Sequence, residues 1–83
     1  MKIRLKLYAS LRDYLPDDAV GNVIEIDVPE GASPHSIIDR FNVPRKLTHL
    51  VLVNGVFAAK DQRELSILKE GDALAIWPPV AGG

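Results

Sequence analysis

The sequence ends in Ala73-Leu74-Ala75-Ile76-Trp77-Pro78-Pro79-Val80-Ala81-Gly82-Gly83, a stretch with two unlike halves. Residues 73–77 are apolar at every position, which is typical of a strand covered on both faces and predicts a central place in a sheet. The two prolines that follow fix φ near −65° and remove two backbone donors, so the strand cannot continue through them. We therefore predict a folded domain over residues 1–77 and an extended tail over residues 78–83.

Two stretches near the N-terminus alternate between hydrophobic and polar residues, with the period of two that is typical of a half-buried strand. These stretches are residues 2–9 and 23–28, and their inward side chains are expected to be Ile3, Leu5, Leu7, Ile24, Ile26 and Val28. The segment between them contains breakers, so the two strands are predicted to form an antiparallel hairpin. Ser10 is expected to cap one or two helical turns directly after the first strand.

The middle of the chain carries one helix signal. Ser33 supplies a capping hydroxyl and Pro34 fits the first helical position, where no amide partner is needed. The helix is expected to run to about Phe41 and to pack Ile37, Ile38 and Phe41 across the sheet.

A second hairpin signal follows this helix. Residues 49–53 are apolar on both parities, which suits a strand covered on both sides or one placed at a partner surface. Asn54-Gly55 predicts a type I′ turn into a short return strand over residues 56–58. Residues 59–66 give no firm signal, although Leu65 and Leu68 are expected to lie under the sheet.

The predicted order is strand, strand, helix, strand, strand, strand, with the last strand beside the first. This order corresponds to an α+β fold of the ubiquitin-like β-grasp type. We expect a mixed sheet of about five strands with one main helix packed on one face.

The composition narrows the classes of function. The 83 residues carry a net charge of −1 with acidic and basic residues interspersed, so no basic stripe points to nucleic acid. Cysteine is absent, which excludes disulfides, thiolate metal sites and a cysteine nucleophile. The chain has neither a signal-peptide pattern nor an apolar run of membrane-spanning length, so we expect a cytoplasmic protein without membrane contact.

No catalytic or cofactor motif stands out. The sequence has no Gly-x-x-x-x-Gly-Lys-Ser/Thr phosphate loop and no paired-histidine metal spacing. His35 and His49 are interpreted as surface or hydrogen-bonded residues in preference to metal ligands. Arg45-Lys46 fits an acidic partner and scattered surface charge about equally well. We therefore expect no metal or cofactor bound by this chain, and no catalysis by this chain alone.

Residues 70–83 closely resemble the ending of the MoaD/ThiS sulfur carriers. In that family a Gly-Asp turn leads into an apolar strand, and the ending Pro-Pro-Val-Ala-Gly-Gly is typical of the molybdopterin synthase small subunits. Residues 7–12 resemble the first strand and helix of the family, and Val53-Asn54-Gly55 resembles its central hairpin. The helix between Pro34 and Pro44 is shorter than the leucine-rich helix of many members.

The resemblance implies that Gly83 is adenylated by an E1-like adenylyltransferase of the MoeB/ThiF type and then converted to a thiocarboxylate. ATP would be held by that partner. The charged tail would then enter a large subunit of the MoaE type and donate sulfur during molybdopterin biosynthesis. Gly82, which has no side chain, would allow the tip to enter a channel too narrow for other residues. The arm would be formed by Pro78, Pro79, Val80 and Ala81.

Other readings of the sequence remain open. The same carrier chemistry serves thiamine thiazole formation, tRNA thiolation and cysteine synthesis, and an activated glycine can also be joined to lysines as a ubiquitin-like modifier. A plain interaction module with an inert tail is a further alternative. Phe57 and Trp77 are candidates for the docking surface, because aromatic residues near a functional tail make good interface anchors. A core position fits each of them equally well.

Overall fold

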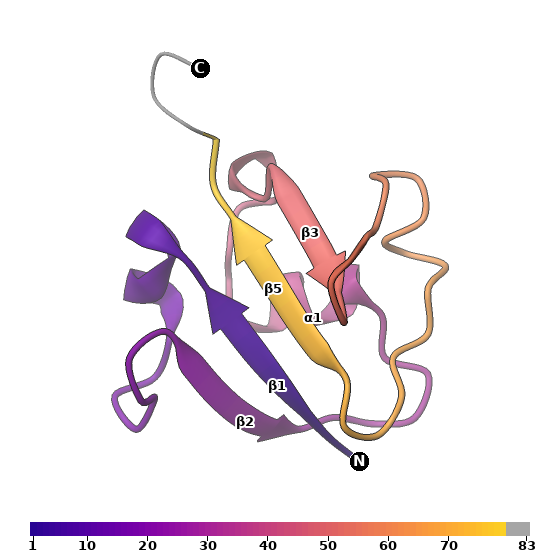
Figure 1. Cartoon of the computed structure of the whole chain (residues 1–83), viewed down its shortest axis with the longest axis horizontal. Helices are drawn as coiled ribbons and strands as arrows, with labels where there is room; N and C mark the ends of the chain where they lie inside the picture. Colours follow the sequence, from indigo (N-terminus) through magenta and orange to yellow (C-terminus); the bar gives the residue numbers. More distant parts are fainter. Residues whose placement is uncertain (80–83) are drawn as a thin grey trace.

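A five-stranded mixed sheet forms one layer of the fold, and one main helix packs on one of its faces (Figure 1). The computed structural model describes residues 1–79. The strands are β1 (Lys2–Leu7), β2 (Val23–Asp27), β3 (Leu50–Val53), β4 (Val56–Phe57) and β5 (Ala73–Trp77). Their order in the sheet is β2-β1-β5-β3-β4, with β5 parallel to β1 and antiparallel to β3. The predicted β-grasp fold and the central place of β5 are confirmed.

The first hairpin has the predicted faces. Strands β1 and β2 pair antiparallel, with Leu5 opposite Ile24. The six side chains predicted to point inward are all buried. β1 ends two residues earlier than predicted, because Ala9 has a φ of 51° and the chain turns there into the 3-10 helix η1 (Ala9–Tyr14). The predicted cap at Ser10 is wrong, because the helix has already begun at Ala9 and no side chain caps it.

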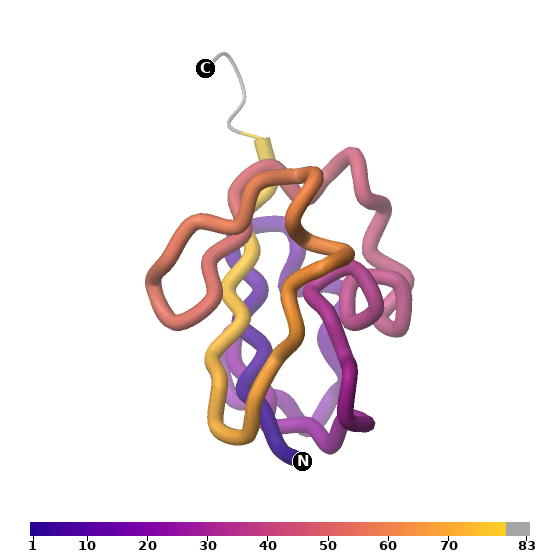
Figure 2. Tube along the Cα trace, turned by 90° about the vertical axis from the view of Figure 1, so that its right-hand side faces the viewer, coloured from indigo at the N-terminus to yellow at the C-terminus, as the bar shows by residue number. Residues whose placement is uncertain are grey.

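Helix α1 (Pro34–Arg40) begins where the sequence predicted. The Ser36 amide donates to Ser33 Oγ at 3.2 Å, and the Ser33 amide donates to Ser36 Oγ at 2.9 Å. This reciprocal capping box satisfies two amides that the helix itself leaves without partners. Ile37 and Ile38 are buried against the sheet, and Figure 2 shows the helix on one side of the strands only. The short 3-10 helix η2 (Arg45–Leu47) follows it.

The second hairpin also forms as predicted. Asn54 and Gly55 have φ angles of 52° and 82°, the left-handed conformation that a type I′ turn requires at both positions. Only one face of β3 belongs to the core. Val51 is fully buried toward the helix, whereas Leu50 and Leu52 are half-buried on the opposite face of the sheet. The prediction that this strand is covered on both sides is therefore wrong within the isolated chain, and the alternative of a strand at a partner surface is left.

The long connection between β4 and β5 differs most from the prediction. Leu68 is buried as expected, but Leu65 is 77% exposed. Successive turns cause this, because the amides of Leu65 and Ser66 both donate back to the carbonyl oxygen of Gln62. Arg63 is buried in place of Leu65, with an exposure of 2%. Within residues 1–79, no helix has the length and apolar character needed to cross a membrane.

Candidate functional site: the root of the C-terminal tail

The end of β5 is held on both sides. The Tyr8 amide donates to the Ile76 carbonyl at 3.1 Å, and the His49 amide donates to the Trp77 carbonyl at 3.0 Å. Pro78 and Pro79 have no amide hydrogen, so pairing to the sheet stops directly after Trp77. The tail therefore leaves the domain from its central strand, between two neighbours that fix its starting point.

Aromatic and apolar side chains surround this point. The rings of Tyr8 and Trp77 stack with centroids 4.1 Å apart and planes 5° from parallel. Beside them, an open hollow of about 450 Å³ extends along the first residues of the tail. The hollow is lined by Ala9, Ser10, His49, Leu50, Trp77, Pro78 and Pro79. A second chain that grips the tail would meet a preformed, mostly apolar hollow at its root.

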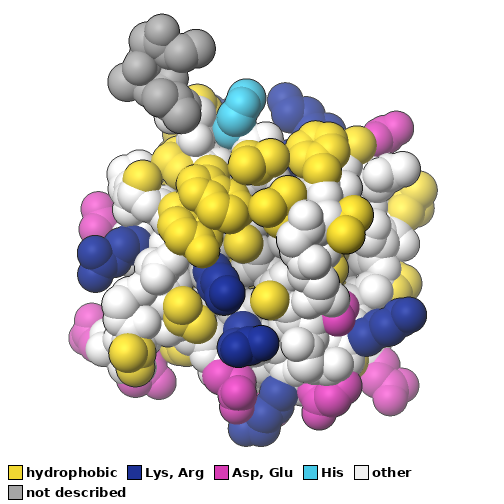
Figure 3. Space-filling model, in the orientation of Figure 1, with side chains coloured by type: hydrophobic (Ala, Val, Ile, Leu, Met, Phe, Trp, Pro, Cys, Tyr) yellow, Lys and Arg dark blue, Asp and Glu magenta, His cyan; other side chains and the backbone are white. Residues whose placement is uncertain are grey.

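The hollow continues into a larger apolar area on the face of the sheet away from α1. Strand register places Leu50 opposite Trp77, Leu52 opposite Ala75, and Phe57 opposite Leu52. We call this set the outer patch, and it consists of Tyr8, Leu50, Leu52, Phe57, Ala75 and Trp77. Figure 3 shows hydrophobic side chains gathered over the half of this face nearest the tail, with Lys and Arg side chains beyond them. Part of that basic border comes from β1, where Arg4 lies opposite Ala73 and Lys6 lies opposite Ala75.

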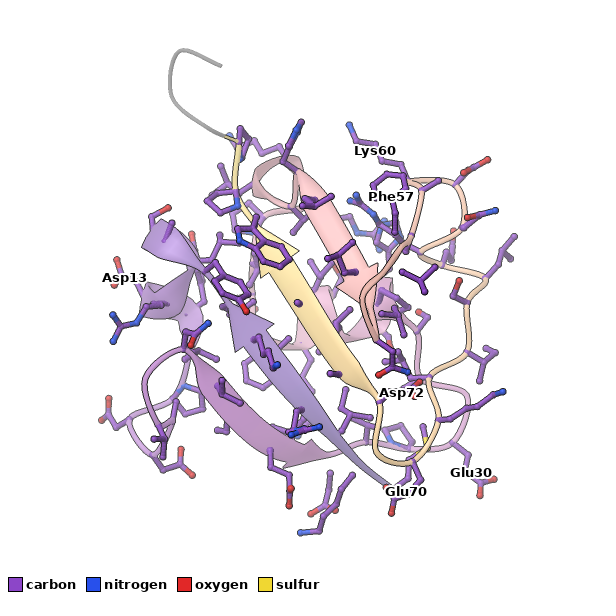
Figure 4. The ribbon with its side chains drawn as sticks, viewed as in Figure 1. Asp13, Glu30, Phe57, Lys60, Glu70 and Asp72 are labelled. Carbon is purple, nitrogen blue, oxygen red and sulfur yellow. The ribbon has the colours of Figure 1, made fainter. Side chains whose placement is uncertain are left out.

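Both aromatic candidates for docking lie outside the core. Phe57 is 55% exposed, and it projects from β4 at the edge of the sheet farthest from β2 (Figure 4). Trp77 is half-buried under its stack with Tyr8. The core interpretation of these two residues is therefore wrong. Leu50 and Leu52 agree with the alternative that residues 49–53 form a strand at a partner surface. Sequence reasoning missed Tyr8 as a member of the patch, although an aromatic residue at an outward position of the first strand was a usable signal.

The ionisable side chains of the described residues bear on two properties, metal binding and protonation. Among residues 1–79, no cluster of three or more His, Cys, Asp or Glu side chains could hold a metal. Burial, followed by the charges of Arg45 and Arg63, lowers the pKa of His35 below its usual value. Its Nδ1 is enclosed and has no hydrogen-bond partner among the described residues. His35 is thus held neutral at neutral pH.

Arg45 is engaged within the chain. It donates two hydrogen bonds to Asp39, from Nε at 3.1 Å and from Nη2 at 2.7 Å. The hydrogen bond from Arg45 is the main reason that the pKa of Asp39 lies below its usual value. The acidic-partner interpretation of Arg45-Lys46 therefore rests mainly on Lys46.

Comparison with protein families matches residues 5–83 to the ThiS family. The chain belongs to the ThiS family. Members of this group are ThiS/MoaD-like, ubiquitin-like sulfur carriers and related modifiers. No curated protein sequence gives a significant match to this chain.

Solved structures of similar proteins share the fold. SAMP1 of Haloferax volcanii is 26% identical with a TM-score of 0.68, and the match covers 100% of both chains. The HVO 2177 protein of the same organism is 25% identical with a TM-score of 0.76, over 100% of this chain and 87% of the other. A chain in the complex of subunits 1 and 2 of the molybdopterin-converting factor of Helicobacter pylori is 15% identical with a TM-score of 0.61, over 100% of both chains. The last likeness concerns the fold alone.

The structure describes only the first part of the predicted arm. Pro78 is half-buried at the root, and Pro79 is exposed. Val80, Ala81, Gly82 and Gly83 lie outside the described residues. The roles predicted for these four residues, and for the arm as a whole, remain predictions.

Proposed function

We propose that this ThiS-family chain is the small, sulfur-carrying subunit of a molybdopterin synthase. One observation carries the proposal: the central strand β5 ends at Trp77, and Pro78-Pro79 then lead directly into the sequence Val80-Ala81-Gly82-Gly83. An arm that starts from the rigid middle of a sheet and ends in two glycines suits delivery of a terminal carbonyl into a narrow active site of another protein. The proposal requires a free carboxylate on Gly83.

The chemistry proceeds at that carboxylate. A carboxylate resists nucleophiles, so one of its oxygens first attacks the α-phosphorus of ATP, which forms the acyl adenylate and releases pyrophosphate. A sulfide nucleophile then attacks the glycine carbonyl carbon, the bond from that carbon to the AMP oxygen breaks, and AMP leaves with the electron pair. The product is a thiocarboxylate. An E1-like enzyme holds the ATP, and the carrier supplies only the reacting terminus and the surface that presents it.

The outer patch is the proposed docking surface for this activating enzyme and for a MoaE-type large subunit. The patch adjoins the root of the tail, and its edge residue Phe57 is more than half exposed. Exposed aromatic residues beside a site of chemistry are typical anchors of protein interfaces. Because both partners would cover the same face, they bind in turn, and the carrier is recharged between them.

A second candidate function has support of its own. SAMP1, described as a small archaeal modifier protein, is similar to this chain over its whole length. An acyl adenylate at Gly83 reacts with a lysine amine as well as with sulfide, and the amide so formed attaches the chain to another protein. Conjugates heavier than the free chain, bearing Gly83 on a lysine, would establish this function in cells that express the chain.

The first candidate is tested by charging and delivery. The chain is incubated with an E1-like enzyme, ATP and a sulfur source, and its intact mass should rise by the difference between one sulfur and one oxygen atom. The charged chain is then mixed with a MoaE-type subunit and the pterin precursor. Formation of the dithiolene product assigns the chain to molybdopterin synthesis, whereas charging without delivery assigns it to another sulfur pathway such as thiazole formation, tRNA thiolation or cysteine synthesis.

A further inference from the structure

Arg63 is a buried cation without an acidic partner. It lies in the connection between β4 and β5, and its exposure is 2%. No carboxylate within residues 1–79 lies within salt-bridge distance of its guanidinium. Burial lowers the pKa of Arg63, but a guanidinium remains charged at any ordinary pH. Removing such a charge from water is costly, and an apolar side chain of similar size often fills the same space at no loss of stability. The hydrogen bonds of this side chain therefore need an explanation beyond packing.

The guanidinium bonds three backbone carbonyls from two separate segments. Its Nε donates to the Ala58 carbonyl at 3.1 Å, and its Nη1 donates to the Thr48 carbonyl at 2.7 Å. Its Nη2 donates to the His49 carbonyl at 3.2 Å. Only a planar group with several fixed donors can reach all three oxygens at once.

One of these segments also holds the root of the tail. The His49 amide donates to the carbonyl of Trp77, the last residue of β5 before the prolines. Arg63 bonds the carbonyl of Thr48, which belongs to the same peptide unit as the His49 amide, and it also bonds the carbonyl of His49. Hydrogen bonds thus connect the buried guanidinium, through the backbone of Thr48 and His49, to Trp77, the last residue before the tail.

A second set of bonds fixes this segment against the helical layer. The Thr48 hydroxyl donates to the Arg45 carbonyl at 2.6 Å, and the His35 amide donates to the Arg63 carbonyl at 3.2 Å. Thr48 is thus held by η2, and the backbone of Arg63 is held by α1. The Trp77 carbonyl, which the guanidinium supports indirectly, lies at the end of β5, where pairing to the sheet stops.

We propose that Arg63 is a positioning residue, which sets the direction in which the tail leaves the domain. The inference rests on the proposed function, because direction matters only if Gly83 must enter the active site of a partner. Small misplacements of a reacting group lower the rate of the chemical step strongly. The side chains of the outer patch lie on the other face of the sheet. Among the described residues Arg63 makes no hydrogen bond to any of these side chains, although it bonds the backbone carbonyls of His49 and Ala58, which adjoin Leu50 and Phe57 in the chain. Loss of Arg63 should therefore lower kcat for activation of the tail while KM for the carrier stays unchanged.

The test uses the full chain as the substrate of its activating enzyme, with pyrophosphate release as the readout. Arg63→Met keeps the volume and removes the donors, so we expect kcat to fall by about ten- to a hundredfold with an unchanged KM. Arg63→Lys retains a charge and part of the bonding, and should recover part of kcat. Phe57→Ser, in the outer patch, should show the opposite pattern, with a raised KM and an unchanged kcat.

A matched control separates positioning from stability. Ile38→Val weakens the core at a residue that makes no hydrogen bond to residues 48, 49, 58 or 77, and it is compared with Arg63→Met at temperatures where both variants are fully folded. If Ile38→Val lowers kcat as much as Arg63→Met does, or if Arg63→Met leaves kcat unchanged, the proposal is wrong.

Amide hydrogen exchange makes the result independent of the activating enzyme. In Arg63→Met the His49 amide should exchange faster, while the amides that pair β1 with β2 keep their protection. Unchanged exchange at His49 overturns the proposal whatever the kinetics show. A wild-type chain that no activating enzyme accepts refutes the proposed function instead, and the exchange measurement still decides whether Arg63 holds the root.

Discussion

Tyr8 and Trp77 stack face to face across the parallel pair of β1 and β5, with their ring centroids 4.1 Å apart. Tyr8 is the residue between β1 and η1, and Trp77 is the last residue of β5. The stack therefore links the first turn of the chain to the point where the tail begins, and it forms the side of the outer patch nearest β1. Its two residues have one structural role within the domain and a second, proposed role toward partners.

Replacing Tyr8 tests the structural role. Tyr8→Leu keeps an apolar side chain but removes the stacked ring, and a stacked aromatic pair contributes about 0.5–1.5 kcal/mol beyond the area it buries. We expect the free energy of unfolding to fall by about that amount, and the tryptophan fluorescence to report a more polar environment. Urea denaturation measures the first effect. Val20→Ala, at a side chain that is 83% exposed, is the control and should leave stability nearly unchanged.

Truncation of the helix core should be much more costly. Ile38 is 1% exposed beneath the sheet, and removing a buried isoleucine side chain to alanine costs about 2–5 kcal/mol. Leu65→Ala is the matched control, because Leu65 is 77% exposed and should change stability by no more than about 0.5 kcal/mol. Equal losses in the two variants, measured by denaturant unfolding, would contradict the assigned core.

The neutral state of His35 predicts a dependence of stability on pH. The pKa of His35 is lowered in the folded chain, chiefly by burial and then by Arg45 and Arg63, so the unfolded chain binds a proton at higher pH than the folded chain does. Stability is therefore full above the ordinary pKa of 6.5 and declines as the pH falls below it. His35→Gln should remove this decline. Unfolding midpoints of both proteins, measured on either side of pH 6.5, check the prediction, and parallel curves would contradict it.

The outer patch predicts a change in affinity without a change in fold. Phe57→Ser removes an exposed aromatic side chain, so the free energy of unfolding should change by less than about 0.5 kcal/mol. Affinity for the activating enzyme should fall by about tenfold or more if Phe57 anchors the interface. Titration calorimetry measures this loss. Val20→Ser serves as the control, because Val20 is also an exposed apolar residue, at 83%, but lies beside β2, at the edge of the sheet opposite Phe57.

Local patterns in the sequence were sufficient for most of the fold. Alternation in residues 2–9 and 23–28 predicted the first hairpin, the Ser33-Pro34 pair predicted the start of the helix, and Asn54-Gly55 predicted the second turn. The central place of β5 followed from its apolar character on both faces. Each of these signals depends on residues that are close in the sequence.

The features that sequence reasoning missed depend on distant residues. Arg63 is buried where backbone carbonyls of residues 48, 49 and 58 accept its hydrogen bonds. No sequence pattern near residue 63 predicts these acceptors. The stack of Tyr8 on Trp77 requires the parallel register of β1 and β5, which is set by the whole sheet. The outer patch is likewise assembled from three strands, β3, β4 and β5, and from Tyr8, which follows β1. The tail could be predicted from residues 78–83 alone, whereas the surface around its root depends on contacts that only the folded chain shows.

If Gly83 carries sulfur, mass spectrometry of the intact chain will record it. The chain is treated with an E1-like enzyme, ATP and a sulfur source, and a variant that lacks Gly82 and Gly83 is treated in parallel. We predict that the intact mass of the full chain rises by the difference between sulfur and oxygen, that fragmentation places the change on Gly83, and that the mass of the shortened chain is unchanged. An unaltered mass of the full chain, with an enzyme that charges another carrier in the same reaction, would contradict it.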